Sequence, residues 1–327
     1  MKLLITGGAG FIGTNYVYHV LNTHPNDSVI VLDALTYAGN KENIASLAHE
    51  PRFQFVRGDI CDATVVDVLV SRVDAVVHIA AETHVDRSIQ DGALFVKTNV
   101  VGTQTLLDAC RTHRVRFHHV STDEVFGSLG MDGYFTEESP YDPRSPYSAS
   151  KAAADHLVRA AWHTHKLPVT ISNCSNNYGP YMFPEKLIPL FITNILEGKK
   201  VPLYGKGENI RDWLYVEDHC AGIDAALRRG RPGETYCFGG HSERSNAELT
   251  QTILFEMGVG KEVIQHVADR PGHDFRYAIN PHKAETELGW RIKTPFLHGL
   301  RHTIAWYTSN RAWWEPLKRR AATKPSP

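Results

Sequence analysis

Cysteine is scarce in this chain of 327 residues, and its five cysteines lie far apart at positions 61, 110, 174, 220 and 237. Their number is odd, and no two of them have Cys-x-x-Cys spacing. This pattern argues against a disulfide framework and against a zinc site. It favours a reducing compartment, so we predict a cytoplasmic location.

Long hydrophobic runs are also missing. No stretch approaches the roughly 18 apolar residues that a membrane helix needs. The apolar start of the chain ends at Thr6-Gly7-Gly8, too early for a signal peptide, so none is expected. The net charge of −1 gives no electrostatic reason to expect binding to nucleic acid or to a membrane surface. The 18 histidines are scattered, and no metal site is predicted.

The chain does contain a regular alternation of strands and helices in its first half. Nearly unbroken apolar segments predict strands at residues 2–6, 28–33, 53–56, 75–80, 115–121 and 168–173. Helical periodicity is clear at residues 95–112, 147–165 and 216–228. This order predicts an α/β fold of Rossmann type, in which helices cover both faces of a doubly wound parallel sheet.

The pattern changes after about Asn177, where proline and glycine become frequent. We predict a smaller α/β domain whose segments interleave with the first domain. The boundaries are residues 1–176 plus about 205–235 for the first domain, and residues 177–204 and 236–315 for the second. Residues 316–327, which end in Lys-Pro-Ser-Pro, are predicted to be a flexible tail.

A glycine motif, Thr-Gly-Gly-Ala-Gly-Phe-Ile-Gly at residues 6–13, follows the first predicted strand and opens a predicted helix. This glycine spacing permits a tight turn and the close approach of a pyrophosphate to the helix N-terminus. Asp33 ends the next predicted strand about 20 residues later, where an acid can bind the adenine ribose hydroxyls and would repel a 2′-phosphate. The first domain is therefore predicted to bind NAD rather than NADP. The alternative is a glycine-rich turn without a ligand.

Two further segments follow the third and fourth predicted strands, namely Gly58-Asp59-Ile60 and residues 80–84. Small residues there would let a cofactor lie against the carboxyl edge of the sheet. For Asp59, a loop or helix-cap role is as plausible as contact with adenine.

Tyr147 and Lys151 stand four residues apart, on one face of a predicted helix. A free tyrosine has a pKa of about 10, and a nearby ammonium and a positive nicotinamide ring both favour its phenolate. Tyr147 could then remove an alcohol proton as a hydride leaves. The spacing alone usually indicates only a packed tyrosine beside a solvated lysine, so the preceding dinucleotide motif carries this interpretation.

Thr122, Asp123 and Glu124 follow the fifth predicted strand. Burial and mutual repulsion would separate the pKa values of two adjacent carboxyl groups, giving one acid and one base. The alternative is a helix cap beside a surface acid.

These motifs together resemble the extended short-chain dehydrogenases/reductases and, more narrowly, the dTDP-glucose 4,6-dehydratases. The resemblance extends over nearly the whole chain. Its stretches are residues 6–13, 35–40, 80–88, 121–127, 147–151, 176–189, 211–219 and 269–274. The segment around Asp123 and those beginning at Asn176 and Arg211 are the most specific to the dehydratases.

The resemblance implies a role for each matching residue. Thr122 would hydrogen-bond the C4 oxygen of the sugar, Asp123 would protonate the departing C6 hydroxyl, and Glu124 would remove the C5 proton. The expected NAD contacts are Gly7, Gly10, Phe11, Ile12, Gly13, Asp33, Ala34, Leu35, Thr36, Asp59, Ile60, Ala80, Ala81, Glu82, Thr98, Tyr147, Lys151 and Asn177. The expected contacts with the nucleotide diphosphate sugar are Thr83, Thr122, Asn176, Lys186, Leu187, Pro202, Tyr204, Arg211, Asn246, Asp269, Arg270 and His273.

Two positions depart from the family pattern. The family usually has tyrosine where Phe126 stands and serine where Thr83 stands. Thr83 keeps a hydroxyl that can contact the sugar, whereas Phe126 lacks one.

The expected reaction is that of a lyase: oxidation at C4, loss of water across C5–C6, and return of the hydride to C6. The sequence leaves open whether the nucleotide is thymidine or uridine. A nucleotide-sugar 4-epimerase is the alternative enzyme, and a non-catalytic NAD-binding regulator is the alternative of another class. The resemblance also implies a homodimer, formed through helices near residues 98–110 and 147–163 that carry apolar residues on more than one face.

Overall fold

In the computed structural model, which describes residues 1–269 and 274–322, seven parallel strands form one sheet. Their order is β10-β6-β5-β4-β1-β2-β3, and the direction of winding changes between β1 and β4. The strands are β1 (Lys2–Thr6), β2 (Ser28–Asp33), β3 (Phe53–Arg57), β4 (Ala75–His78), β5 (Arg116–Thr122), β6 (Val169–Cys174) and β10 (Thr235–Phe238). A change of direction between neighbouring parallel strands is where doubly wound sheets bind ligands, at the carboxyl ends of the strands.

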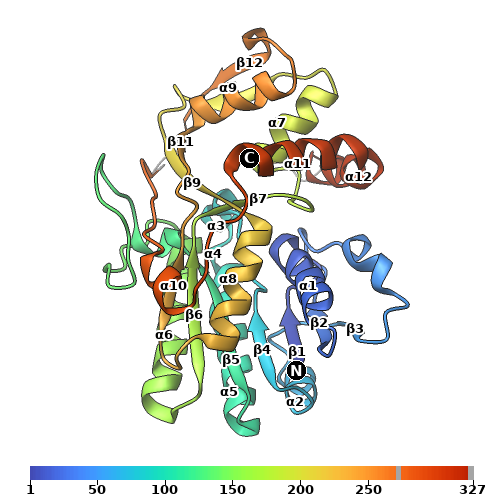
Figure 1. The fold of residues 1–327 in the computed structure, drawn as a ribbon, viewed down its shortest axis with the longest axis vertical. Helices are drawn as coiled ribbons and strands as arrows, with labels where there is room; N and C mark the ends of the chain where they lie inside the picture. The colour runs from blue at the N-terminus through green and yellow to red at the C-terminus, as the bar shows by residue number, and fades with distance from the viewer. Residues whose placement is uncertain (270–273, 323–327) are drawn as a thin grey trace.

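Helices cover both faces of this sheet (Figure 1). On one face α1 (Phe11–Thr23) packs against α8 (Val216–Arg229). On the other, α5 (Gly102–His113) packs between α2 (Ala63–Val70) and α6 (Pro146–His165). Apolar side chains of the inner strands, such as Leu4 and Ile5, are fully buried between these layers. The predicted Rossmann-type fold is therefore confirmed.

The predicted helix at residues 95–112 is divided in the structure. Residues 92–113 form α4 (Gly92–Phe95), a π-helical segment η2 (Val96–Val101) and α5 in succession. Asn99 in η2 donates to the Glu82 carbonyl and to Ser150 Oγ of α6, and it accepts from the Glu82 amide at 2.9 Å. The π-helical segment therefore ties the loop after β4 to the helix that carries Tyr147, and such segments are frequent at functional sites.

A smaller lobe gathers at the carboxyl end of the large sheet (Figure 1). Its strands form a sheet of order β11-β9-β7 and a parallel pair β12-β8. Buried Trp213, Leu249, Leu300 and Trp314 belong to its core. Its elements are β7 (Asn176–Tyr178), α7 (Leu187–Leu196), β8 (Val201–Tyr204), β9 (Ile210–Tyr215), β11 (Glu243–Ser245), α9 (Asn246–Glu256), η4 (Lys261–Val263), β12 (Ile264–Val267), α11 (Phe296–Ser309) and α12 (Arg311–Ala322).

Short segments complete the described chain: η1 (Lys41–Leu47), α3 (Val85–Gln90), η3 (Asp123–Phe126) and α10 (His282–Glu287). Within the described ranges, no helix is both long and apolar enough to span a lipid bilayer.

Three elements differ from the predicted domain segments. Strand β10 pairs with β6, so residues 236–238 belong to the large sheet, and β9 lies in the small-lobe sheet although residues 205–235 were assigned to the first domain. Residues 316–322 are helical rather than a flexible tail, because α12 buries Trp314 and Leu317 against the small lobe. Residues 323–327 of the predicted tail lie outside the described residues.

Candidate active site

The glycine loop after β1 has room only for glycine at two points. A side chain at Gly7, whose φ is +71°, would place its Cβ 2.7 Å from the backbone of Ala80. At Gly13 the Cβ would lie 2.1 Å from the Gly7 carbonyl oxygen. Gly10 precedes α1, and no side chain caps the helix there. The first N–H groups of α1 are thus available to an anionic ligand at this end.

Asp33 is held at the end of β2 by backbone hydrogen bonds. Its Oδ2 accepts from the Ala9 amide at 2.9 Å and its Oδ1 accepts from the Leu35 amide at 2.8 Å. Burial raises the pKa of Asp33, and these two N–H groups oppose the rise. Each carboxylate oxygen offers two lone pairs, so the side chain can still accept from ribose hydroxyls. The loop and this acid fit an adenine dinucleotide.

A cavity runs along the carboxyl edge of the sheet at these residues, and most of the predicted cofactor contacts line it. They are Gly7, Gly10, Phe11, Ile12, Gly13, Asp33, Ala34, Thr36, Asp59, Ile60, Ala80, Ala81, Glu82 and Thr98. Leu35 lines a neighbouring hollow instead. Tyr147, Lys151 and Asn177 are not among the lining residues; the amide of Asn177 donates to the Ser175 carbonyl and contacts His219.

Several lining residues were not predicted, notably Tyr37, Lys97, Met182 and Phe183. Tyr37 belongs to the family-like stretch at residues 35–40, which was a signal that could have identified it. Met182 and Phe183 likewise belong to the family-like stretch at residues 176–189, and the folded structure places them at the same cavity as the glycine loop.

Helix α6 carries the Tyr147/Lys151 pair into the protein. The helix begins with a capping box at Ser145 and a proline at its first position, both strong start signals. Lys151 is buried; its Nζ donates to the Val120 carbonyl at 2.9 Å and lies 3.3 Å from His119 Nε2. Burial lowers the pKa of Lys151 to about 8, and Asp155 opposes the shift. The lysine is thus not the solvated residue of the alternative interpretation.

Tyr147 is also buried, and burial together with Glu124 raises its pKa. The Thr122 side chain lowers the pKa of Tyr147 and so acts in the opposite direction, by favouring the phenolate. The structure therefore brings Tyr147 to the Thr122-Asp123-Glu124 segment.

Thr122 ends β5 and caps η3, where its Oγ1 accepts from the Glu124 amide at 3.3 Å. The same hydroxyl donates to Asp123 Oδ1 at 3.3 Å. Asp123 is almost fully buried, and burial and Glu124 raise its pKa well above the usual value. A cap is therefore present, as the alternative interpretation supposed, but Asp123 is no surface acid, and its surroundings favour the protonated form that an acid catalyst needs.

Arg211 on β9 reaches the same region, because its charge acts on Asp123 and its guanidinium stacks 4.2 Å from the ring centre of Tyr277. It donates to backbone carbonyls, among them Ile210 at 2.8 Å and Asp274 at 3.0 Å. These bonds hold a buried cation beside Asp123.

The remaining predicted substrate residues come from several elements of the small lobe. Asn176 and Asn246 each have a buried side-chain oxygen without a hydrogen-bond partner among the described residues, as does Asp123 through Oδ2. Such atoms require a polar ligand or water. Lys186 and Thr83 line the cofactor cavity, Leu187 begins α7, and Pro202 and Tyr204 lie on β8. Asp269 contacts the Gly205 turn region, whereas Arg270 and His273 lie outside the described residues.

The two departures from the family pattern have different surroundings. Phe126 is buried, and its ring stacks on Phe135 with their centres 5.1 Å apart. Thr83 lines the cavity, and its side chain lowers the pKa of Tyr37, which burial raises.

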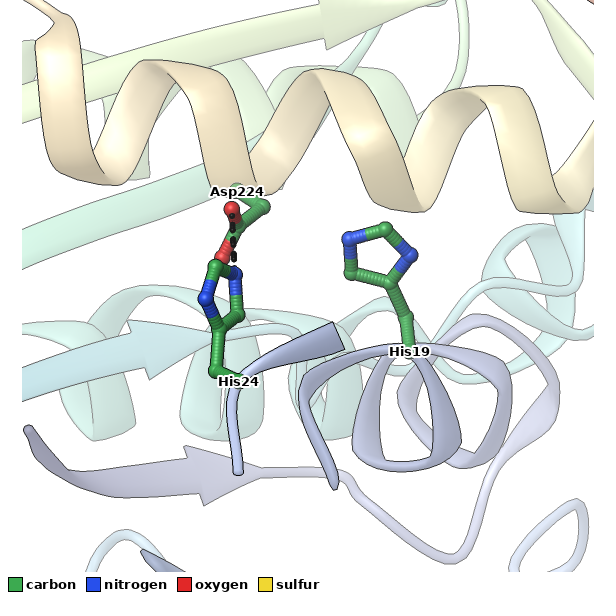
Figure 2. A group of neighbouring side chains, drawn as sticks. All are labelled: His19, His24 and Asp224. Atoms are coloured by element: carbon green, nitrogen blue, oxygen red, sulfur yellow. Dashed lines mark hydrogen bonds and ion pairs between the residues drawn. The ribbon is translucent and has the colours of Figure 1, made fainter. Parts of the chain in front are cut away.

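One histidine cluster lies elsewhere. His19 and His24, at the C-terminal end of α1, face Asp224 of α8 (Figure 2). His24 Nε2 lies 3.0 Å from Asp224 Oδ2, and Arg228 donates to Asp224 Oδ1 at 2.8 Å. Because both carboxylate oxygens already bond these neighbours, we assign the cluster to an ion-pair network that fastens α1 to α8.

Comparison with known proteins bears on this site. The family model described as GDP-mannose 4,6 dehydratase matches residues 4–303. A dTDP-glucose 4,6-dehydratase of Streptomyces niveus is 54% identical over 324 residues, covering 97% of this chain and 96% of the relative. The chain belongs to the dTDP-glucose 4,6-dehydratase family. The resemblance based on the motifs is therefore confirmed.

Solved structures agree with this membership. The dTDP-glucose 4,6-dehydratase DesIV of Streptomyces venezuelae, with NAD and TYD bound, has a TM-score of 0.94 and 52% identity, covering 97% of this chain and 100% of that chain. A dTDP-glucose 4,6-dehydratase of Bacillus anthracis in complex with NAD has a TM-score of 0.92 and 48% identity, covering 97% and 99%. A UDP-glucose 4-epimerase of Thermotoga maritima has a TM-score of 0.89 but only 27% identity, covering 95% and 100%. The epimerases thus share the fold at much lower identity.

Proposed function

We propose that this member of the dehydratase family is an NAD-dependent lyase that converts dTDP-glucose into its 4-keto-6-deoxy product. The observation that carries the proposal is the buried Asp123, which accepts from the Thr122 hydroxyl at 3.3 Å and lies, with Glu124, near enough to Tyr147 to raise the pKa of that tyrosine. An oxidation base and an acid for elimination therefore occupy one site. When bound, NAD supplies the chemistry of accepting a hydride from C4 and giving it back to C6.

The residues that would hold NAD are those of the cavity along the glycine loop. Gly7 and Gly13 would allow the pyrophosphate to approach, and Asp33, held by the Ala9 amide, would accept from the adenine ribose. Thr98 and Lys97 border the same cavity from the π-helical segment.

Each catalytic side chain then has one task. Tyr147 takes the proton of the C4 hydroxyl, with buried Lys151 favouring the phenolate. The resulting ketone acidifies C5–H, Glu124 removes that proton, and Asp123 protonates the C6 oxygen so that water leaves. Glu124 afterwards returns a proton to C5.

Arg211, Lys186 and Asn246 supply binding rather than chemistry. A guanidinium and an ammonium suit the two negative charges of a diphosphate, and arginine can bind it by paired hydrogen bonds. The oxygen of Asn246 that lacks a partner suits a donor group of the nucleotide.

A labelled substrate tests this proposal. Substrate deuterated at C4 is expected to give a product that has lost water and carries the deuterium at C6, because the hydride never leaves the site. Mass spectrometry and NMR of early product provide the measurement. A 4-epimerase would give no mass change, a non-catalytic regulator no product, and loss of the label to solvent would contradict a closed hydride cycle.

The position of Asp33 leads to a second expectation. Protein that is purified and then denatured should release NAD rather than NADP, because the carboxylate would repel a 2′-phosphate. Liquid chromatography of the released nucleotide checks this, and release of mainly NADP would refute the role of Asp33.

We further infer a homodimer. Four apolar side chains are exposed on α3, α4 and η2: Ile89, Leu94, Val96 and Val101. They lie beside α5 and α6, the helices predicted to form the interface, and a second copy would cover them. Sedimentation of the protein at micromolar concentration should show a dimer, and a monomer alone would contradict the inference.

The five free cysteines favour a cytoplasmic location.

A further inference from the structure

Three titratable side chains follow one another at every fourth position on the buried face of α6: Tyr147, Lys151 and Asp155. Residues four apart on a helix lie one above the other on the same face. The proposed function, on which this inference rests, gives tasks to Tyr147 and Lys151 but none to Asp155. Asp155 is fully buried, and a buried carboxylate is costly unless hydrogen bonds and an opposite charge compensate it.

The surroundings of Asp155 favour its ionised form. Its Oδ2 accepts from the Tyr141 hydroxyl at 2.7 Å and from the Ser121 hydroxyl at 2.9 Å. Burial alone would raise the pKa of this carboxyl group, but His119, Lys151 and Tyr141 hold the pKa below its usual value. Asp155 is therefore negatively charged at neutral pH.

One imidazole nitrogen joins Asp155 to Lys151. His119 Nε2 lies 3.1 Å from Asp155 Oδ1 and 3.3 Å from Lys151 Nζ. Burial lowers the pKa of His119 to about 4, so the ring is neutral at neutral pH and supplies no positive charge. Lys151 Nζ also donates to the Val120 carbonyl at 2.9 Å, which holds the ammonium beside the ring. The positive charge that faces Asp155 is therefore that of Lys151.

We propose that Asp155 is the counter-ion of Lys151 and a positioning residue for the reaction. Asp155 holds Lys151 in its ammonium form, and the ammonium in turn favours the phenolate of Tyr147 one helical turn away. Asp155 is not among the described residues that line the cofactor cavity, so it acts through Lys151.

Replacing Asp155 by asparagine keeps the shape of the side chain and removes its charge. Burial lowers the pKa of Lys151 to about 8, and Asp155 opposes that fall. Without Asp155 the pKa of the lysine falls further, so the ammonium is lost at a lower pH. The alkaline limb of the kcat–pH profile should therefore move down by about one pH unit, the lower end of the effect of a nearby opposite charge. The variant should match wild-type kcat at about pH 6 and be about tenfold slower at about pH 9, with KM unchanged.

The other titratable groups around the pair leave this comparison clear. Burial lowers the pKa of His78 on β4 and of His119 on β5, and it raises the pKa of Tyr141 and of Cys174 on β6. These four groups therefore keep one charge state between about pH 6 and about pH 9. Four more groups lie close to this cluster or to Tyr147 and affect both enzymes alike: Asp123, Glu124, His156 and Arg159.

Tyr141→Phe is the matched control, because it removes a neutral donor from the same carboxylate and leaves the charge in place. Its alkaline limb should coincide with that of wild type. An unchanged alkaline limb in Asp155→Asn, or an equal loss of kcat at every pH, would overturn the proposal. Failure of the proposed function is a different result, since wild-type enzyme would then form no dehydrated product at any pH.

Unfolding by urea at neutral pH in the presence of NAD gives a second measurement, which does not depend on activity. Asp155→Asn leaves the buried ammonium of Lys151 without its counter-ion, so the urea midpoint should fall. In a Lys151→Met background the carboxylate has already lost its cation, and Asp155→Asn should lower the midpoint less or raise it. An equal fall in both backgrounds, or failure to fold in both, would show that Asp155 does not pair with Lys151 and would overturn the proposal.

Discussion

Replacing Tyr147 by phenylalanine is expected to lower kcat by about 10²–10⁴-fold, the usual contribution of a general base. The phenylalanine ring keeps the edge contact that Tyr147 makes with Phe95, at 6.3 Å between ring centres, so packing should change little. The loss would therefore come from the hydroxyl that accepts the C4 proton. KM should stay close to the wild-type value, because the contacts proposed between Arg211, Asn246 and the nucleotide are unchanged.

Steady-state kinetics of Tyr147→Phe provide the measurement, and a matched variant gives the baseline. Tyr236→Phe also removes a buried hydroxyl. The Tyr236 hydroxyl donates to Glu287 and accepts from the Arg231 amide, near the start of β10. That variant should show near-normal kcat. If Tyr147→Phe also keeps near-normal kcat, Tyr147 is not the base.

The large sheet could be predicted from sequence because its inner strands are buried on both faces and read as continuous apolar runs. The glycine loop and α6 were also predictable. In both, a local signal fixes the geometry: a glycine spacing that leaves no room for a side chain at Gly7, and a capped helix that places Tyr147 and Lys151 one turn apart.

Other features depend on contacts between residues distant in sequence. The π-helical segment η2 exists where Asn99 bonds both Glu82 and Ser150, and helical periodicity alone does not reveal such a segment. Strand β10 is only four residues long and is defined by pairing with β6. Helix α12 itself has a basic, proline-containing sequence that is typical of a tail, yet its Trp313 indole donates to Asn43, near the large sheet, at 2.7 Å.

The candidate site shows the same division. Asp123 and Tyr147 could each be predicted from a local motif, but their proximity depends on how α6 packs against β5. That packing is held by Lys151 of α6, which donates to the Val120 carbonyl at 2.9 Å, and by Ser121 of β5, which donates to Asp155 of α6 at 2.9 Å. The burial that raises the pKa of Asp123 is likewise a property of the assembled lobes.

Replacing Glu124 by glutamine is expected to stop the reaction between oxidation and elimination. Glutamine keeps nearly the same size but cannot take the C5 proton, so kcat should fall by about 10²–10⁴-fold. Tyr147 and Lys151 remain, and oxidation at C4 should still occur in the first turnover. The variant should therefore convert its bound cofactor to the reduced form, seen as new near-ultraviolet absorbance, and release little dehydrated product.

Single-turnover absorbance together with mass spectrometry of the quenched mixture separates the two steps. Glu138→Gln is the matched control, because Glu138 is an exposed acid outside the cavity, and it should behave like wild type. Normal dehydration by Glu124→Gln would assign the C5 proton to another base. The charge of Glu124 raises the pKa of Tyr147, so its removal favours the phenolate. Oxidation in Glu124→Gln should therefore be at least as favourable as in wild type, and the block should fall on elimination. Absence of the reduced cofactor would contradict this division of roles, because it would mean that Glu124 is needed before elimination.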